Sequence, residues 1–355
     1  MTNDMMTPQW EMDGEDLLRE YREKQTVKKT FGKIGFALFV MMTVWVGFTL
    51  LTAIVVGVAS VGAPFVLDFY NEYALIFNEL GLALGVAASL LVLRDMPQVV
   101  PARQPFTVGR FMKLLSIAFA VSSVGNWIGT FVIGIWNGAT GSEVTNEVID
   151  MVMETDPWIS FLAVGLAAPF LEEFFFRKLL IDRLRPMGEL AAVMTSASLF
   201  ALFHGNFSQL FYAFGAGVLL SYLYLRSGSF FLTFLFHAVF NTVSGVLPMI
   251  FMEDVLAFTE QIEELTEETL IEMMPSLFEE YGGALLYYGF HLMLIGVMSL
   301  LGLIFFFSAF RKTKLEKSGT SLSRKAFFGT AIKNAGMILA LAFLLVMMAL
   351  SLIQF

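Results

Sequence analysis

Long apolar runs recur along the whole chain and are separated by short polar segments. A helix of about 20 apolar residues can cross the hydrocarbon core of a bilayer, because each residue adds about 1.5 Å. The runs are 34–60, 73–93, 111–137, 158–181, 188–204, 209–225, 229–250, 283–309 and 328–354. The pattern predicts an all-α polytopic membrane helical bundle with about 8–9 transmembrane helices.

The positive charges fall on alternate connecting segments. Four segments contain no Lys or Arg: 61–72, 139–157, 205–208 and 251–282. The 22 basic residues lie elsewhere, in groups such as Arg177–Arg185 and Arg311–Lys325. Cytoplasmic loops are enriched in Lys and Arg, so the four segments are predicted to be extracytoplasmic and the N-terminus cytoplasmic.

Composition limits the class of protein and its partners. Hydrophobic residues make up 57% of the chain and the mean hydropathy is +0.72, which no ordinary soluble fold could bury. Cysteine is absent, so disulfides, thiolate metal ligands and a catalytic thiol are excluded. The N-terminal basic residues are matched by acids, so no nucleic acid partner is expected. We expect an integral membrane protein with membrane lipid around it, in a bacterial plasma membrane.

Five regions follow from these patterns. They are a cytoplasmic N-terminal segment (1–33) without a removable signal peptide, N-terminal transmembrane helices (34–157), a core that carries the candidate chemistry (158–250), an acidic extracytoplasmic loop (251–282) and C-terminal transmembrane helices (283–355). The acidic loop is expected to form one or two surface helices. Three Gly-x-x-x-Gly motifs, at Gly81, Gly125 and Gly134, predict close helix packing.

Two carboxylates and a guanidinium lie within the apolar run 158–181, at Glu172, Glu173 and Arg177. Charged groups inside a membrane helix are costly and indicate a functional site by default. Glu173 and Arg177 are four residues apart and are predicted to form an ion pair, which leaves Glu172 without a cation and suited to act as a general base. The alternative is a structural ion-pair cluster that ties helices together.

Two of the three histidines follow in the same core. His204 ends an apolar run and precedes a glycine, so it is either a site residue or a helix-capping histidine. His237 and Asn241 are four residues apart, a spacing that places both side chains on one helix face, where they can hold a metal or an oxyanion. Their alternative is a hydrogen bond between helices.

The ordered set Glu-Glu-x-x-x-Arg, Phe-x-x-x-His and His-x-x-x-Asn resembles the CAAX-type prenyl protease and bacteriocin-processing family of intramembrane endopeptidases, also called the Abi or CPBP family. The resemblance covers about residues 158–250 and implies a catalytic set of Glu172, Glu173, Arg177, His204, His237 and Asn241. In that set Glu172 would activate the attacking water, and Glu173 and Arg177 would support the site.

The resemblance leaves the cofactor and the substrate open. Either His204 and His237 hold a zinc ion, or the enzyme is metal-free and His237 and Asn241 stabilise the oxyanion. The substrate would be a membrane-associated peptide or a prenylated, CAAX-type protein. The alternative function is a non-catalytic membrane scaffold, an immunity protein or a transporter that retains the fold.

The predicted boundaries conflict with a shared site. At about 1.5 Å per residue they place His237 about 12 Å, Glu172 about 14 Å and His204 about 24 Å from the inner membrane face. Groups at such different depths could not act together. Either the fifth helix begins above the membrane plane, extends inward or tilts, or the predicted boundaries are wrong by a turn or two.

Overall fold

The computed structural model describes residues 14–144, 151–153, 155–263, 265–310, 315–316 and 320–353, and every regular element in these ranges is helical. The N-terminal helices are α1 (Gly14–Ser60), α2 (Phe65–Glu72), α3 (Ala74–Leu93) and α4 (Val108–Thr140). The central helices are α6 (Pro157–Ser160), α7 (Ala168–Glu173), α8 (Asp182–Leu184), α9 (Glu189–Phe203), α10 (Phe207–Ser227) and α11 (Phe230–Asn241). The last helices are α12 (Met252–Glu263), α13 (Glu267–Phe310), α14 (Arg324–Ile332) and α15 (Ala335–Leu350). The predicted all-α bundle is confirmed.

Seven helical segments are long and apolar enough to cross a membrane, or eight if the bent pair α14 and α15 counts as one. The predicted fifth span is wrong as a full crossing, because α9 has only 15 residues. It extends about 22 Å, less than the hydrocarbon core of about 30 Å. The last predicted span is broken by a 72° bend between α14 and α15.

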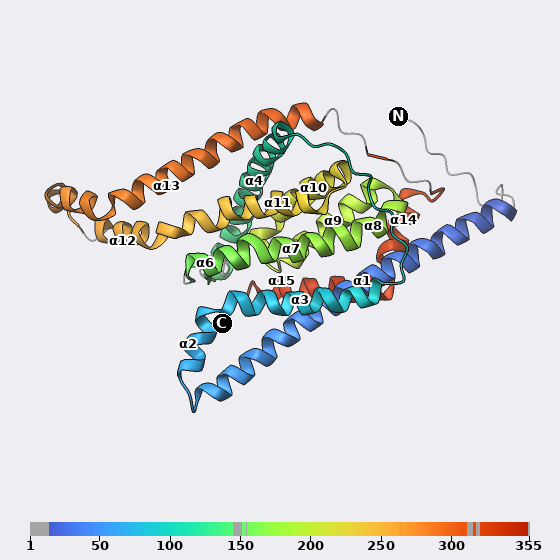
Figure 1. Cartoon of the computed structure of the whole chain (residues 1–355), viewed down its shortest axis with the longest axis horizontal. Helices are drawn as coiled ribbons and strands as arrows, with labels where there is room; N and C mark the ends of the chain where they lie inside the picture. Colours follow the sequence, from blue (N-terminus) through green and yellow to red (C-terminus); the bar gives the residue numbers. More distant parts are fainter. Residues whose placement is uncertain are drawn as a thin grey trace.

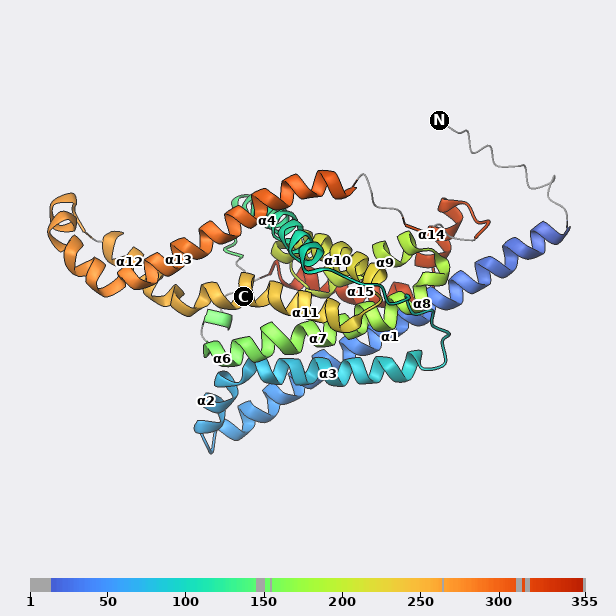
Figure 2. The same ribbon diagram turned by 45° about the horizontal axis from the view of Figure 1, so that its top comes forward.

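The central segment is held between two groups of helices (Figures 1 and 2). On one side α1 packs against α3 and α15, and on the other α4 packs against α13. Helix α10 lies between them, in contact with both α4 and α9. The central segment therefore has protein on two sides, which allows polar groups to be kept away from lipid.

Two of the three predicted glycine contacts are present. A Cβ atom at Gly125 would lie 2.6 Å from backbone atoms of Tyr212, and one at Gly129 would lie 2.6 Å from the Ser208 carbonyl oxygen. A Cβ at Gly85 would lie 2.5 Å from the Met41 carbonyl oxygen. The third motif is wrong as a packing motif, since a Cβ at Gly134 would meet no atom within 4 Å in the described structure.

Side chains connect the helices at the end of the bundle where the basic residues gather, on the right of Figure 1. The Arg183 guanidinium donates to the Leu93 carbonyl, with Nη2 at 3.0 Å. The Asp182 carboxylate accepts from the Tyr224 hydroxyl at 2.8 Å and lies 2.7 Å from Lys178 Nζ. These contacts fix the helix that carries the candidate carboxylates against α3 and α10.

Four of the five predicted regions fall partly outside the described residues, at 1–13, at 145–150 and 154, at 264, and at 311–314, 317–319 and 354–355. Where it is described, the acidic segment 251–282 is helical as expected except at residues 265–266, and it consists mainly of α12 and the first part of α13. Helix α13 continues without a break into the predicted span at 283. The cytoplasmic location of the N-terminus stays a prediction.

Candidate active site

The helices that carry the candidate residues are interrupted by π-helical turns, in which an amide bonds to the carbonyl five residues earlier. Two such turns, Phe161–Ala167 and Thr242–Val246, are each followed closely by a proline, Pro169 or Pro248. Proline lacks an amide N–H and so disrupts the regular ladder of helical hydrogen bonds. A third π-helical turn, Phe174–Ile181, starts directly after Glu173. The two carboxylates therefore end a short α-helix, α7, between two wide turns.

Glu173 lies between a guanidinium and an imidazole. Its Oε1 accepts from His237 Nδ1 at 2.9 Å, and its Oε2 lies 3.2 Å from Arg177 Nε. The side chains of Glu173 and Arg177 have no exposed surface. The predicted ion pair is present, and the carboxylate also holds His237 in one orientation, because an ionised carboxylate can only accept the Nδ1 hydrogen.

Glu172 is buried beside this pair without a hydrogen-bond partner on Oε2 among the described residues. That oxygen lies 3.7 Å from His237 Nε2, which is too long for a direct hydrogen bond. The two groups are close enough to contact the same small molecule. The structure thus separates the two carboxylates: Glu173 is paired twice, and Glu172 faces the imidazole across a gap.

Phe200 is the aromatic side chain around which the charged groups gather. The Arg177 guanidinium carbon lies 4.6 Å from its ring centroid, and the rings of His204 and His237 have centroids 4.8 and 5.9 Å from it. Cation–π attraction partly compensates a guanidinium whose nitrogens have no hydrogen-bond partner within the described part of the chain. The phenylalanine of the Phe-x-x-x-His motif thus packs against the rings of both histidines.

His204 follows the last residue of α9, and its Nδ1 lies 2.8 Å from the Phe200 carbonyl oxygen. Since a carbonyl only accepts, Nδ1 carries the hydrogen and the other ring nitrogen of a neutral His204 is an acceptor. The ring contacts of Phe200 with both His204 and His237 place the end of α9 beside His237, so the assumption that both helices start at the same depth was wrong. His204 is therefore both a helix-terminal histidine and a neighbour of the other candidate residues.

Asn241 is engaged with the other interrupted helix. Its amide nitrogen donates to the Val164 carbonyl oxygen at 3.2 Å. In this π-helical turn the Ala168 amide bonds to the Ala163 carbonyl, so the Val164 carbonyl would pair with the amide of Pro169. Pro169 has none, and the Asn241 side chain supplies the missing donor. This contact uses one of the two amide hydrogens and brings Asn241 to the helix that carries Glu172.

The six candidate residues therefore come together from three helical segments, and all six lie in one region that matches a known family. Residues 154–243 match the family model described as Rce1-like, Type II CAAX prenyl endopeptidase Rce1-like. The resemblance predicted from the motifs is confirmed. Neither a curated protein nor a solved structure matches the chain. The matched family is a family of membrane proteases.

In the described part of the Rce1-like region, residues 155–243, the side chains do not form a three-ligand metal site. Within the described ranges no group of three or more His, Asp and Glu side chains is arranged to hold a metal ion. Both nitrogens of His237 face the carboxylates of Glu173 and Glu172, and one nitrogen of His204 is used by the Phe200 carbonyl. The predicted pair of zinc ligands, His204 and His237, thus lacks a third.

One neighbour of the site comes from outside the Rce1-like region. Glu79, on α3, is buried and interacts electrostatically with Glu172. Its Oε1 accepts from Asn78 at 3.1 Å, whereas its Oε2 has no hydrogen-bond partner among the described residues. Asn78 in turn accepts from the indole of Trp45 at 3.1 Å, and Trp45 stacks on Phe203, the residue before His204. Glu79 was not among the predicted site residues, although an acid within the run 73–93 was a sufficient signal.

Proposed function

We propose that this protein is an intramembrane endopeptidase in which Glu172 activates the attacking water. The observation that carries the proposal is the contrast between the two adjacent carboxylates. Glu173 is neutralised by Arg177 and His237, while a Glu172 oxygen has no hydrogen-bond partner in the described structure and faces His237 Nε2 at 3.7 Å. A buried carboxylate held in this way is suited to take a proton from water.

In the proposed reaction, Glu172 accepts one proton from a water molecule as the water oxygen bonds to the scissile carbonyl carbon. The unprotonated nitrogen of His204 accepts a hydrogen bond from the same water and orients it. The carbonyl π electrons move to oxygen and form a tetrahedral oxyanion. The C–N bond then breaks, and Glu172 returns the proton to the leaving amine, so that one water is consumed for each peptide bond.

Two side chains are placed to stabilise the oxyanion. Asn241 has a second amide hydrogen besides the one it donates to Val164. His237 is held between Glu173 and Glu172, and its Nε2 faces the gap in which the oxyanion would form. Arg177 does not contact the reacting atoms in this scheme and acts as a positioning residue for Glu173.

The proposed substrate is a membrane-associated peptide or a prenylated, CAAX-type protein. A cluster of four aromatic rings lies beside the carboxylates and next to His237, formed by Phe170, Phe174, Phe230 and Phe234. Phe170 is 46% exposed, so the cluster presents apolar surface to the bilayer. An isoprenoid chain entering from lipid could bury its apolar surface there while the peptide reaches Glu172.

The test compares purified wild type with Glu172→Gln in detergent, using matched peptides with and without a C-terminal prenyl group. The control is Glu72→Gln, which changes an exposed glutamate at the end of α2. We expect Glu72→Gln to cleave as wild type does and Glu172→Gln to be slower by about 100-fold or more, because the general base is lost. Equal cleavage by wild type and Glu172→Gln would overturn the proposed role, and no cleavage by any of the three would favour a non-catalytic scaffold or transporter.

A second arm tests the cofactor. The same assay is repeated after dialysis against a zinc chelator, and the metal content of the purified protein is measured. The proposed metal-free reaction predicts unchanged cleavage and less than one bound zinc per chain. Loss of cleavage that added zinc restores would show that the enzyme needs a metal. We also propose that the protein lies in a bacterial plasma membrane with its basic end in the cytoplasm.

A further inference from the structure

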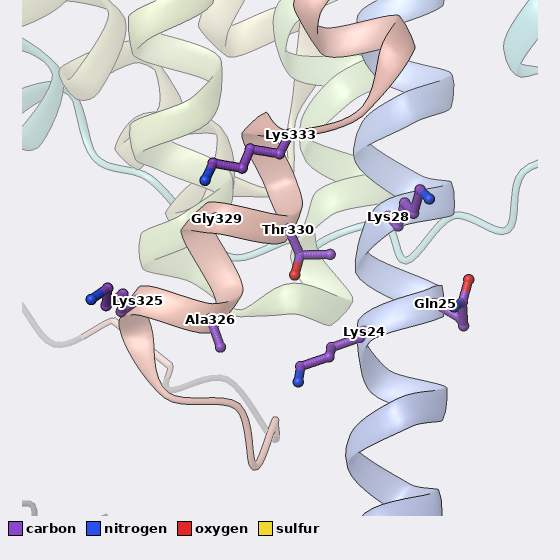
Figure 3. Close-up of a pocket in the computed structure, with 8 residues that line it drawn as sticks. All are labelled: Lys24, Gln25, Lys28, Lys325, Ala326, Gly329, Thr330 and Lys333. Atoms are coloured by element: carbon purple, nitrogen blue, oxygen red, sulfur yellow. The ribbon is translucent and has the colours of Figure 1, made fainter.

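A pocket lined with lysines lies between the first helix and α14, far from the Rce1-like region in sequence (Figure 3). It has a volume of about 490 Å³, and its basic residues are Lys24 and Lys28 on α1 and Lys325 and Lys333 on and directly after α14. A second pocket of about 580 Å³ shares Lys28 with it and continues along α1 past Lys29 and Lys33. No acidic residue lines either pocket in the described part of the chain.

The lysines differ in whether their charge is already compensated. Lys24 Nζ lies 2.5 Å from Glu20, and Lys33 pairs with Asp95, whose pKa is lowered by that hydrogen bond. Four others, Lys28, Lys29, Lys325 and Lys333, have no carboxylate within ion-pair distance among the described residues. Lys28, Lys325 and Lys333 line the first pocket, and Figure 3 shows Lys28 directed away from α14 and Lys325 and Lys333 directed away from α1. An anion bound between the two helices would attract the three flexible ammonium groups toward it.

The walls of the pocket are fixed by contacts between distant parts of the chain. The Glu23 carboxylate accepts from the Thr320 and Ser321 hydroxyls at 2.7 and 2.9 Å, which holds the segment before α14 against α1. The Phe31 and Phe327 rings pack edge to face with centroids 5.7 Å apart. The two faces are therefore held in place whether or not an anion is bound.

The position of the pocket relative to the bilayer indicates its ligand. It lies at the basic end of the bundle, directly before the apolar run of α1 begins at residue 34. Helix α14 leaves the axis of α15 by 72°, buries Phe327 and Ala331 against the bundle and leaves Phe328 and Ile332 exposed. The second pocket extends from the lysines to Phe36 and Leu339, which are both 43% exposed. The lysines of the two pockets therefore adjoin the exposed apolar side chains of Phe36 and Leu339.

We propose that this pocket binds an anionic phospholipid, with the phosphate between Lys28, Lys325 and Lys333 and an acyl chain along Phe36 and Leu339. Basic pockets between helices on the cytoplasmic side of membrane proteins bind anionic headgroups. A soluble phosphate compound would use the lysines but not the apolar groove. The inference does not depend on proteolysis, since lipid binding is measured without a substrate.

The test uses the full chain, purified, delipidated and titrated with phosphatidylglycerol or phosphatidylcholine of identical acyl chains, with binding followed by native mass spectrometry. The pocket variant is Lys28→Gln/Lys325→Gln/Lys333→Gln. The matched control is Arg94→Gln/Arg103→Gln/Arg110→Gln, which removes three exposed positive charges from the same end of the bundle outside the pocket. Arginine at the three lysine positions gives a third variant that keeps the charge.

Wild type, the control and the arginine variant are expected to prefer phosphatidylglycerol over phosphatidylcholine. The pocket variant should lose this preference, with affinity for phosphatidylglycerol lower by about 100-fold at roughly a factor of five per lysine. An equal loss in the control would show general charge attraction and overturn the site. Competition by glycerol phosphate, at the concentration at which the whole lipid binds, would overturn the lipid in favour of a soluble anion.

Discussion

The Glu173 carboxylate accepts a hydrogen bond from His237 Nδ1 at 2.9 Å across 64 residues of sequence, while its other oxygen lies 3.2 Å from Arg177 Nε. One carboxylate thus joins the Glu-Glu-x-x-x-Arg and His-x-x-x-Asn motifs. Glu173 thus fixes the orientation of His237, although Glu173 does not face the gap between Glu172 and His237. The two glutamates, although adjacent, should respond differently to the same substitution.

Glu173→Gln is predicted to lower the stability of the protein, and Glu172→Gln is not. The first change leaves Arg177 buried without its counter-charge, and breaking a buried pair costs about 3 kcal/mol or more. The second removes a carboxylate whose Oε2 has no hydrogen-bond partner in the described structure. Thermal unfolding of both variants in the same detergent measures the difference. Equal losses would contradict the division of roles.

Asn241→Ala is predicted to destabilise the contact between α11 and the turn Phe161–Ala167 by about 1 to 3 kcal/mol, because the Val164 carbonyl loses its donor. The double-mutant cycle with Pro169→Ala tests the reason. Alanine at position 169 has an amide N–H, which the π-helical hydrogen-bond pattern directs to the Val164 carbonyl. Asn241→Ala should therefore lower stability less in the Pro169→Ala background than in wild type. An unchanged cost would show that the amide of Asn241 does not compensate for the proline.

The fold was largely predictable because membrane helices must satisfy their own backbone hydrogen bonds, so length and hydropathy identify them. Two helices were not predicted correctly, and both for the same reason. The run 188–204 has the composition of a span but forms a helix of only 15 residues, and the run 328–354 bends after Lys333. Hydropathy measures burial in an apolar medium and does not distinguish lipid from the interior of a bundle.

Only the contacts within a single helix of the site could be predicted from the sequence. The pairing of Glu173 with Arg177 follows from their spacing, which brings side chains together on one helix. The bond from Glu173 to His237 depends on how two helices pack, and no spacing within either helix specifies it. Asn241 was expected to lie on the same helix face as His237, but its hydrogen bond to Val164 could not be predicted, since the need for a donor arises at Pro169 on another helix. Glu79 comes from a helix outside the matched region altogether.

Glu79→Gln is predicted to change the pH dependence of cleavage without loss of fold. Glutamine keeps the oxygen that accepts from Asn78 but cannot carry a charge. Glu79 interacts electrostatically with Glu172, and charges of one sign repel strongly in a medium of low dielectric constant. Without that charge the electrostatic environment of Glu172 changes, so the pH profile of cleavage should shift. Profiles of kcat/KM against pH for wild type, Glu79→Gln and the exposed control Glu72→Gln check this, and identical profiles for all three would contradict it.

Phe170→Ala is predicted to weaken the binding of prenylated substrates selectively. Phe170 contacts Phe174, Phe230 and Phe234 and is 46% exposed, so it forms much of the apolar surface beside the carboxylates. Its loss should raise KM for a prenylated peptide by about 10-fold, which corresponds to roughly 1.4 kcal/mol of apolar burial, and leave kcat unchanged. The unprenylated peptide should show no such change, because it lacks the chain that the cluster is proposed to contact. Phe328→Ala, an exposed phenylalanine on α14, is the control. Equal effects on the two peptides would place the isoprenoid elsewhere on the protein.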